Sequence, residues 1–485
     1  MKIKIVVFLI SFIFGTIITS PSLTPSFNAD GYCNLADGFS KYAETFLASG
    51  RYILALFYYL FGTLNISHEV VSILAIILSN VFLSLSVVAL FHELSKKGNP
   101  MKKILLFLGC LLLYYNPLTL ELLLFEESFG MCLGVFLTTL AAICVNKKNY
   151  KYRWLVSGLL LLLTACCYQG ILCLFVPLSM VLFYKEGIKF KEVFKFLFSC
   201  ILTYAIVYLT IYLSIKFIPP LFAVEITTKV GAIDFSYNLG KVFESTKNLL
   251  ITLSTYTDAK FFWLSIGLLL SSFILFTIGK FKQYYKDYIY FILIIIGSIL
   301  IAIIPCLFMS SNAIYVVCRM CFSIGAIVGF LFILIVKVDS QFSITKYNFL
   351  IIFALILNVY NAYNYYRISD LGYERYKRDV IYANQIQEEI EKYESQNKVE
   401  IEKIYFHRDV QSDGHYTNDK SLYTINIKME DWNFQCGLNG LNNEHYTIEA
   451  MKEKDYLKYF KGQDYQTFDS KQFVFKKSTL YLLLY

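Results

Sequence analysis

Residues 70–91 read VVSILAIILSNVFLSLSVVALF, an apolar stretch without a single charged side chain. A helix of roughly 20 such residues spans the hydrocarbon core of a bilayer, which is about 30 Å thick. Stretches of this kind recur along the chain, which has 485 residues, 57% of them hydrophobic and 18% aromatic. This composition is not that of a water-soluble protein, and it predicts an all-α polytopic membrane protein.

About eleven stretches are apolar enough to be predicted as spans. The first of them resembles a signal peptide in its basic start and short apolar core, but no small-x-small cleavage site follows, so we expect it to be retained. The approximate bounds of the eleven are 3–19, 70–91, 104–115, 128–145, 154–168, 171–184, 196–215, 261–279, 288–308, 320–336 and 347–365.

Lysine and arginine gather in alternate loops, and such residues mark the cytoplasmic side of a membrane protein. One side collects basic clusters such as 96–103, 147–153 and 185–195, whereas the other side carries acidic loops. The segment 154–184 is basic at both flanks, so we expect a hairpin that turns at residues 168–170. The protein is therefore predicted in the cytoplasmic membrane, with its N-terminus inside and the tail after Arg367 outside.

From residue 367 onward the long apolar runs stop, and the remaining chain has the size of a small domain. Residues 370–396 space apolar side chains with helical period, residues 399–407 alternate like a strand, and the closing FVFKKSTLYLLLY reads as one or two strands. We therefore predict a transmembrane domain of residues 1–366 and an extracytoplasmic α/β domain of residues 367–485.

The 12 cysteines lie mostly in predicted spans, where a thiol packs like a small hydrophobe. Cys33 and Cys436 are both predicted outside. They can form a disulfide or remain free thiols, because nothing in the sequence sets the distance between them. The net charge of +8 is carried mostly by the inner loops, which indicates topology and not nucleic-acid binding.

Charged residues gather in the predicted outer loops. They are Asp30, Asp37 and Arg51 of the first outer loop, Glu126 and Glu127 of the second, and Arg319 before a later span. The spans themselves carry almost no ionisable residues, which disfavours an ion-coupled transporter. A carboxylate can take the proton of an attacking sugar hydroxyl, and a guanidinium can bind a lipid phosphate. No cofactor is required for this chemistry, although a divalent cation could bind at Glu126 and Glu127.

Several short motifs carry a resemblance to a known family. They are the Gly50–Arg51 pair, YNPLTLELLLFEESFG (115–130), CCYQG (166–170), VVCRMCFSIG (316–325), LGYERYKRDVIYANQIQEEI (371–390) and DYQTFDSKQFVFKKSTLYLLL (464–484). Together they resemble the bacterial membrane glucosyltransferases that modify O-antigen, the serotype-converting family. The resemblance runs over nearly the whole chain, although each motif is short.

The resemblance implies a GT-C-like inverting enzyme, with its catalytic domain in residues 1–366. Such an enzyme takes a sugar, glucose in the family, from a polyprenyl phosphate outside the membrane and adds it to a cell-surface polysaccharide. The family often shows paired aspartates in the first loop, whereas this chain has only Asp30 in the sequence NADG. Either Asp30 or Asp37 is therefore expected to be the catalytic base.

The remaining residues of the motifs are expected to bind substrate. Arg51 and Arg319 would hold the leaving phosphate, and Tyr168 and Gln169 would contact sugar hydroxyls. Glu126 and Glu127 would bind substrate or a cation. The expected partners are the polyprenyl-phosphate sugar, a surface glycan acceptor and the lipid bilayer. Two alternatives stay open: a translocator of lipid-linked glycans, and a glycan polymerase or ligase.

Overall fold

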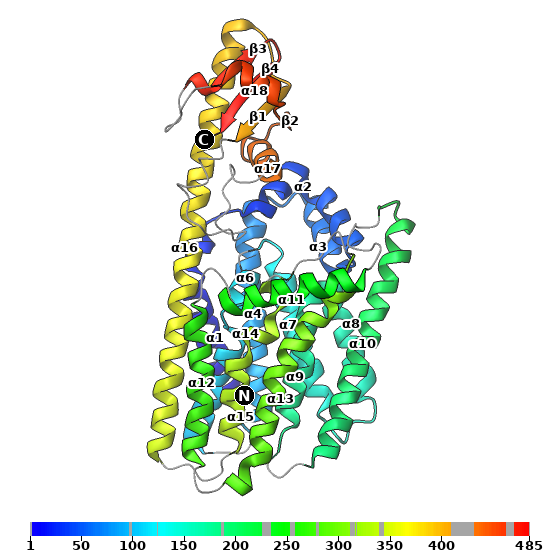
Figure 1. The fold of residues 1–485 in the computed structure, drawn as a ribbon, viewed down its shortest axis with the longest axis vertical. Coiled ribbons are helices and arrows are strands. Elements are labelled where there is room, and N and C mark those ends of the chain that lie inside the picture. Colours follow the sequence, from blue (N-terminus) through cyan, green and yellow to red (C-terminus); the bar gives the residue numbers. More distant parts are fainter. Residues whose placement is uncertain are drawn as a thin grey trace.

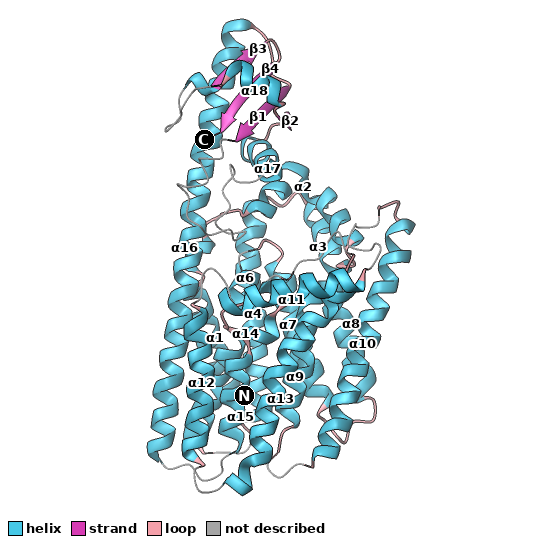
Figure 2. Cartoon of the chain, viewed as in Figure 1, coloured by secondary structure: helices cyan, strands magenta, loops and turns pink. Residues whose placement is uncertain are grey.

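Long helices run side by side in a bundle, and a small β-sheet lies beyond one end of it (Figure 1, Figure 2). The structure is a computed structural model, and it describes residues 2–96, 99–123, 125–185, 189–225, 234–252, 258–277, 281–310, 316, 318–338, 344–408, 431–461 and 470–484. Within these ranges the side chains of a few residues, Asp30 among them, are not described.

Among the described residues, six helices are long and apolar enough to cross a membrane. They are α4 (His68–Leu94), α7 (Ser128–Val145), α10 (Phe190–Leu221), α12 (Ala259–Phe276), α13 (Phe281–Ile303) with η3 (Ile304–Phe308), and α16 (Ile344–Asn397). The predicted count of eleven spans is not confirmed, because the other apolar stretches form shorter helices. These are α1 (Lys2–Ile18), α3 (Tyr52–Thr63), α5 (Pro100–Tyr114), α8 (Arg153–Cys167), α9 (Phe175–Phe183) and α15 (Ile327–Val338).

The chain reverses between α8 and α9 at a short 3-10 helix, η2 (Gln169–Leu174). The side chain of Asn146, just after α7, donates a 3.1 Å hydrogen bond to the carbonyl of Ser179 on α9. The thiol of Cys144 lies 3.7 Å from the carbonyl of Arg153, where α8 begins. The start of α8 and the end of α9 therefore lie at the same end of the bundle, which confirms the predicted hairpin.

Helix α15 lies inside the hydrophobic core, and nearly all of its residues are buried. At Gly329 a Cβ atom would lie 2.6 Å from the Cα of Leu113 on α5, so only glycine fits there. Small residues allow two membrane helices to approach backbone to backbone, which increases their packing contact. The central helix pair α5 and α15 is therefore tightly packed.

Three helices fold from segments that lie between the predicted spans. They are α2 (Ala29–Ala48), α3 and α11 (Phe235–Thr252). Helix α11 lies across the bundle instead of along it (Figure 1). The buried side chain of Asn238 holds α11 by donating 2.9 Å hydrogen bonds to the carbonyls of Leu307 and Met309 beside η3. None of the three was predicted as a span, because a search for long apolar runs does not detect amphipathic or short helices.

Helix α16 continues without a break from the bundle to the sheet, over 54 residues (Figure 1). The predicted span 347–365 and the predicted helix 370–396 are thus one element. No proline interrupts the segment, and each added turn extends an existing helix at little cost. The proposed domain boundary at residue 366 lies inside this helix, and the division into two domains stays a prediction.

The C-terminal sheet has four strands in the order β2-β1-β4-β3. Its strands are β1 (Lys403–Arg408), β2 (Thr447–Ala450), β3 (Phe473–Lys476) and β4 (Thr479–Leu484). β1 is parallel to β2 and β4, and β3 is antiparallel to β4. One face packs on α16 and α17 (Asp431–Asn442), and α18 (Glu453–Tyr459) lies against the other. The predicted strands in β1, β3 and β4 are confirmed, and β2 was missed.

Candidate active site

The first outer loop covers the sheet-bearing end of the bundle with α2 and α3 (Figure 1). Helix α2 begins after Asn28, whose side chain accepts a 2.8 Å hydrogen bond from the amide of Gly31 and caps the helix. Asp30, one of the two predicted bases, lies in the first turn of α2, and its side chain is outside the described part of the structure. Its catalytic role stays a prediction.

Glu126 is a buried carboxylate held by two side chains that the sequence did not single out. The amide of Asn34 donates a 2.5 Å hydrogen bond to Oε2, and Nδ1 of His68 lies 3.1 Å from Oε1. The His68 ring stacks on Phe39 at 3.8 Å between centroids. The Glu126 side chain is only 3% exposed, and a carboxylate so buried requires such partners. Glu126 therefore links α2 to the start of α4.

A small cavity of about 30 Å³ adjoins Glu126. This is about the share of liquid volume that one water molecule takes, so the cavity has room for a hydroxyl-sized group and not for a sugar ring. Its lining is partly polar and consists of Ser22, Ser26, Phe27, Asn28, Gly31, Ser72, Ile76, Leu123, Phe125 and Glu126.

Glu127 lies next to Glu126 and is also buried. It occupies the N-cap position of α7, where the partial positive charge of the helix start stabilises a carboxylate. In the described part of the chain, no group of three or more His, Cys, Asp or Glu side chains could hold a metal ion. A cation at Glu126 and Glu127 therefore stays a prediction.

Arg51 begins α3 and lies against Tyr168. Its guanidinium carbon is 4.7 Å from the centroid of the Tyr168 ring and 5.8 Å from that of Phe46. Among the described residues, the buried Nε of Arg51 has no hydrogen-bond partner. A buried polar atom without a partner is rare in folded proteins. The aromatic neighbours orient the guanidinium and leave a donor for an anion.

The turn before Arg51 is shaped by Gly50 and Gln169. Gly50 has a φ of 76°, and a Cβ atom there would lie 2.7 Å from the Ile215 side chain. Nε2 of Gln169 donates a 2.9 Å hydrogen bond to the carbonyl of Ser49. The amide of Gln169 thus fixes the Arg51 turn, and the predicted sugar contact of Gln169 stays a prediction.

Arg319 lies between the Tyr168 turn and Glu126. Its short helix, η5 (Cys318–Met320), contacts both η2 and α6 (Thr119–Leu123), and its guanidinium carbon lies 4.4 Å from the centroid of the Phe125 ring. A chain of contacts therefore joins six of the eight predicted residues. They are Arg51, Glu126, Glu127, Tyr168, Gln169 and Arg319.

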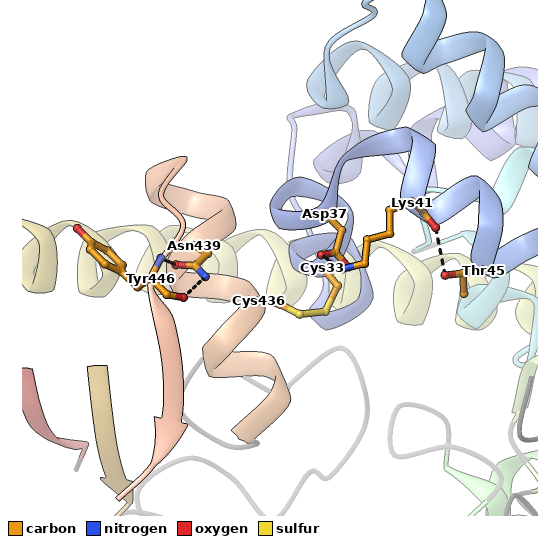
Figure 3. A network of polar contacts seen from close by, with 7 residues as sticks. All are labelled: Cys33, Asp37, Lys41, Thr45, Cys436, Asn439 and Tyr446. Atoms are coloured by element: carbon orange, nitrogen blue, oxygen red, sulfur yellow. Dashed lines mark hydrogen bonds and ion pairs between the residues drawn. A yellow bond between two sulfur atoms is a disulfide. The ribbon is translucent and has the colours of Figure 1, made fainter. Parts of the chain in front are cut away.

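Asp37 does not belong to this cluster. It forms a 2.6 Å ion pair with Lys41 one turn later, and both side chains are exposed. Figure 3 shows Asp37 beside the disulfide that joins Cys33 to Cys436. An exposed ion pair contributes little stability and leaves the carboxylate in contact with water.

An apolar groove of about 590 Å³ runs along α10 between α9, α13 and η3. It is lined by Val176, Pro177, Met180, Leu197, Ile201, Tyr204, Ala205, Tyr208, Leu209, Tyr212, Tyr290, Leu293, Ile294, Ile296, Gly297, Leu300, Ile301, Ile304, Pro305 and Phe308. This almost entirely apolar lining suits an extended hydrocarbon chain.

The Arg51 turn lies at the end of this groove. Tyr212 lines the groove, and two residues further along α10, which is less than one helical turn, the hydroxyl of Ser214 lies 2.8 Å from that of Tyr52. One turn of α-helix rises about 5.4 Å. A second cation, Lys216, lies at the same level with its Nζ 4.8 Å from the Tyr212 ring centroid. Lys216 was missed because it follows a predicted span directly.

A buried polar network connects the start of α2 to α16. The hydroxyl of Tyr32 donates a 2.6 Å hydrogen bond to Asp379, and Arg375 lies 3.7 Å from the same carboxylate. Arg375 also donates to the carbonyl of Phe27. Burial, with the Asp379 carboxylate adding to it, raises the pKa of Tyr32 well above its ordinary value, so the hydroxyl stays protonated. The network fixes the turn that carries Asp30.

A disulfide between Cys33 and Cys436 ties α2 to α17 (Figure 3). The two Cα atoms are 4.6 Å apart. At Gly440 a Cβ atom would lie 2.7 Å from the carbonyl oxygen of Tyr32, so the two helices also pack closely. Of the two alternatives left open by the sequence, the structure contains the disulfide.

One comparison with known proteins finds a match. The profile of the family described as glucosyl transferase GtrII matches residues 23–336, which is well over half of the chain. The matched segment includes the residues around Arg51, Glu126, Tyr168 and Arg319. No curated protein and no solved structure matches the chain. The protein belongs to the glucosyl transferase GtrII family.

Proposed function

We propose that the protein transfers glucose from a polyprenyl phosphate to a cell-surface glycan on the outer side of the cytoplasmic membrane. The observation that carries this proposal is the position of Arg51 at the end of an apolar groove. A donor with a phosphate between a sugar and a long isoprenoid chain matches this arrangement. The membership in a glucosyltransferase family supports glucose as the sugar.

The donor binds with its isoprenoid chain in the groove and its phosphate at Arg51. The lining of α9, α10 and α13 is apolar and accepts the lipid, and the guanidinium of Arg51 supplies the positive charge for the phosphate. Lys216 adds a second positive charge at the same end of α10. Arg319 lies on the side of Glu126 and would stabilise the phosphate as it leaves.

The reaction is a single displacement that inverts the anomeric carbon. The acceptor hydroxyl oxygen forms a bond to C1 of glucose while the bond from C1 to the phosphate oxygen breaks and its electron pair stays on the phosphate. A carboxylate takes the hydroxyl proton. The exposed ion pair of Asp37 favours Asp30 as this base. Glu126, Glu127, Tyr168 and Gln169 would bind the sugar and the acceptor.

Two observations support a site on the outer side. Lysine and arginine gather in the loops at the opposite end of the bundle. The disulfide between Cys33 and Cys436 lies at the site end, and disulfides persist mainly in oxidising compartments. With this orientation the N-terminus is cytoplasmic and the C-terminal sheet is extracytoplasmic.

The experiment supplies the purified protein with radiolabelled polyprenyl-phosphoglucose and delipidated surface polysaccharide from the producing cells, and separately with lipid-linked repeat units. Labelled glucose should enter the polysaccharide, with one polyprenyl phosphate released for each glucose. If whole repeat units are joined and no glucose is transferred, the protein is a polymerase or ligase. If lipid-linked glycan only crosses the membrane, it is a translocator. Either result would overturn the proposal.

A further inference from the structure

The C-terminal sheet presents tyrosines on the face that α18 covers only in part. Tyr405 on β1 and Tyr481 on β4 are directly opposite in register, and their rings lie 5.5 Å apart at an angle of 25°. Tyr459 of α18 lies 4.8 Å from the Tyr481 ring. All three side chains are half-buried. We call these three residues the tyrosine platform.

Polar and charged groups surround the tyrosine platform. Nζ of Lys403 lies 4.8 Å from the Tyr405 ring centroid and forms a 3.1 Å ion pair with Glu449 of β2. Nζ of Lys458 lies 4.8 Å from the Tyr459 ring centroid. The rim therefore carries both signs of charge next to the aromatic rings.

The opposite face of the sheet has a different composition. Ile404, Phe406, Leu480 and Leu482 alternate with the tyrosines along β1 and β4, and all four are buried against α16 and α17. That face provides the core of the C-terminal module. On the described part of the tyrosine face, Met451, Phe460 and Leu483 form a small buried cluster, and the three platform tyrosines pack against it. The three tyrosines therefore pack on this cluster and still leave part of their surface exposed.

We propose that the tyrosine platform binds the acceptor glycan. The face of an aromatic ring is electron-rich, so it attracts the weakly positive C–H groups on the face of a sugar ring. Tyrosine hydroxyls, Lys403 and Glu449 supply donors and acceptors for the sugar hydroxyls at the rim. The mixed charges do not suit a nucleic acid, whose phosphates require a mainly positive surface. This inference rests on the proposed function, because it assigns to the acceptor glycan of that reaction a second binding contact outside the active site.

The attachment of the sheet makes such a contact useful for catalysis. The module is joined to the site-bearing domain by α16, by the packing of α17 on α2 and by the disulfide between Cys33 and Cys436. The sheet lies beyond one end of the bundle, on the side of α2 and α3 (Figure 1), so a long polysaccharide that enters the site from that end can extend to the sheet. A chain held on the platform stays near the site and raises the local concentration of acceptor hydroxyls.

The test measures glycan binding by the full-length protein without any donor. The probe is delipidated surface polysaccharide from the producing cells, and the readout is titration calorimetry. Tyr405→Ala and Tyr481→Ala should each raise the Kd for the polysaccharide about tenfold, which corresponds to a loss of roughly 1.4 kcal/mol of binding free energy. Tyr405→Phe and Tyr481→Phe keep the rings and should retain most of the affinity. Leu457→Ala, an exposed apolar residue of α18, is the matched control and should not change it.

A second readout separates this inference from the proposed function. Release of polyprenyl phosphate from polyprenyl-phosphoglucose in the presence of a short soluble acceptor should be unchanged in the alanine variants, and the KM for long polysaccharide should rise. Thermal unfolding verifies that both variants fold. Unchanged affinity for the polysaccharide in both folded alanine variants would overturn the proposal that the tyrosine platform binds glycan, whatever the outcome for glucose transfer. An equal loss in the Leu457→Ala control would overturn it as well.

Discussion

Tyr32 and Asp379 share a buried 2.6 Å hydrogen bond although 347 positions separate them in the sequence. The bond joins the first turns of α2 to α16, the helix that leads to the C-terminal sheet. The turn that carries Asp30 is therefore held by a part of the chain that is far away in the sequence. Any mechanism that uses the first outer loop depends on this contact.

Tyr32→Phe should destabilise the protein by about 1–3 kcal/mol, because it leaves the buried Asp379 carboxylate without one hydrogen-bond donor. Chemical unfolding in detergent measures the change. Asp370→Asn is the matched control, since Asp370 is an exposed carboxylate on the same helix, and its effect should stay within about 0.5 kcal/mol. Equal stability of Tyr32→Phe and the wild type would show that the hydrogen bond between Tyr32 and Asp379 contributes nothing to the free energy of unfolding.

Arg51→Ala should raise the KM for the polyprenyl-phosphate donor about 10- to 100-fold, since a charged hydrogen bond contributes about 1.5–3 kcal/mol. Arg51→Lys should recover part of the affinity, because lysine keeps the charge and lacks the planar fork. Initial rates at varied donor concentration give the values. Arg378→Ala, an exposed arginine on α16, serves as control. An unaltered KM in Arg51→Ala would exclude phosphate binding by this residue.

Asp30→Asn should lower kcat by about 10²- to 10⁴-fold and leave donor binding intact, as expected for loss of a general base. Asp37→Asn should stay near the wild-type rate, because the Asp37 carboxylate is exposed and paired with Lys41. Single-turnover rates together with donor binding distinguish the two roles. Wild-type turnover in both variants would remove the first outer loop from the mechanism.

Gly297→Phe should raise the KM for a long-chain polyprenyl donor at least tenfold. Gly297 lines the groove, and no atom lies within 4 Å of a Cβ built there, so the new ring can occupy the lipid path without displacing the backbone. Gly267→Phe is the control, since Gly267 has the same free space on α12 but does not line the groove. Equal KM values for both variants would place the lipid elsewhere.

Cys33→Ser should lower the unfolding free energy of the C-terminal module by about 2–5 kcal/mol, the usual effect of removing a native disulfide from a small domain. Thermal unfolding measures the loss. Digestion of the oxidised wild type should yield one peptide pair that contains residues 33 and 436. Cys144→Ser, the loss of a free thiol in α7, should change neither result. Free alkylation of both thiols in protein isolated without reductant would contradict the disulfide and weaken the outer location.

Many local features follow from the sequence because their causes are local. The strands of β1, β3 and β4 were visible as alternating apolar residues, and the α8–α9 hairpin followed from basic residues at both flanks. Six of the predicted site residues lie in one connected cluster because each occupies a loop or turn at the same end of the bundle. Charge bias and span length determine which loops share an end.

Other features had no local signal. Asn34 and His68 looked like ordinary polar residues of a helix and a helix start, and only their shared contact with Glu126 reveals a role. The continuity of α16 was hidden because the membrane part and the water-exposed part of one helix differ in composition. The number of spans stays a prediction, because hydrophobicity alone does not set helix length and six described helices are long and apolar enough to cross a membrane.

The sequence by itself indicated that this chain lies in a membrane, which loops share a side, and that carboxylates and arginines gather in loops of one side. These properties depend on hydrophobicity and charge within single segments, which do not change with folding. The tertiary structure alone decided that the turn of Arg51 lies near the end of the groove, that Asp37 stands apart, and that Tyr32 and Cys33 are bound to residues near the other end of the chain. Such contacts depend on the packing of helices hundreds of residues apart, and no local pattern encodes that packing.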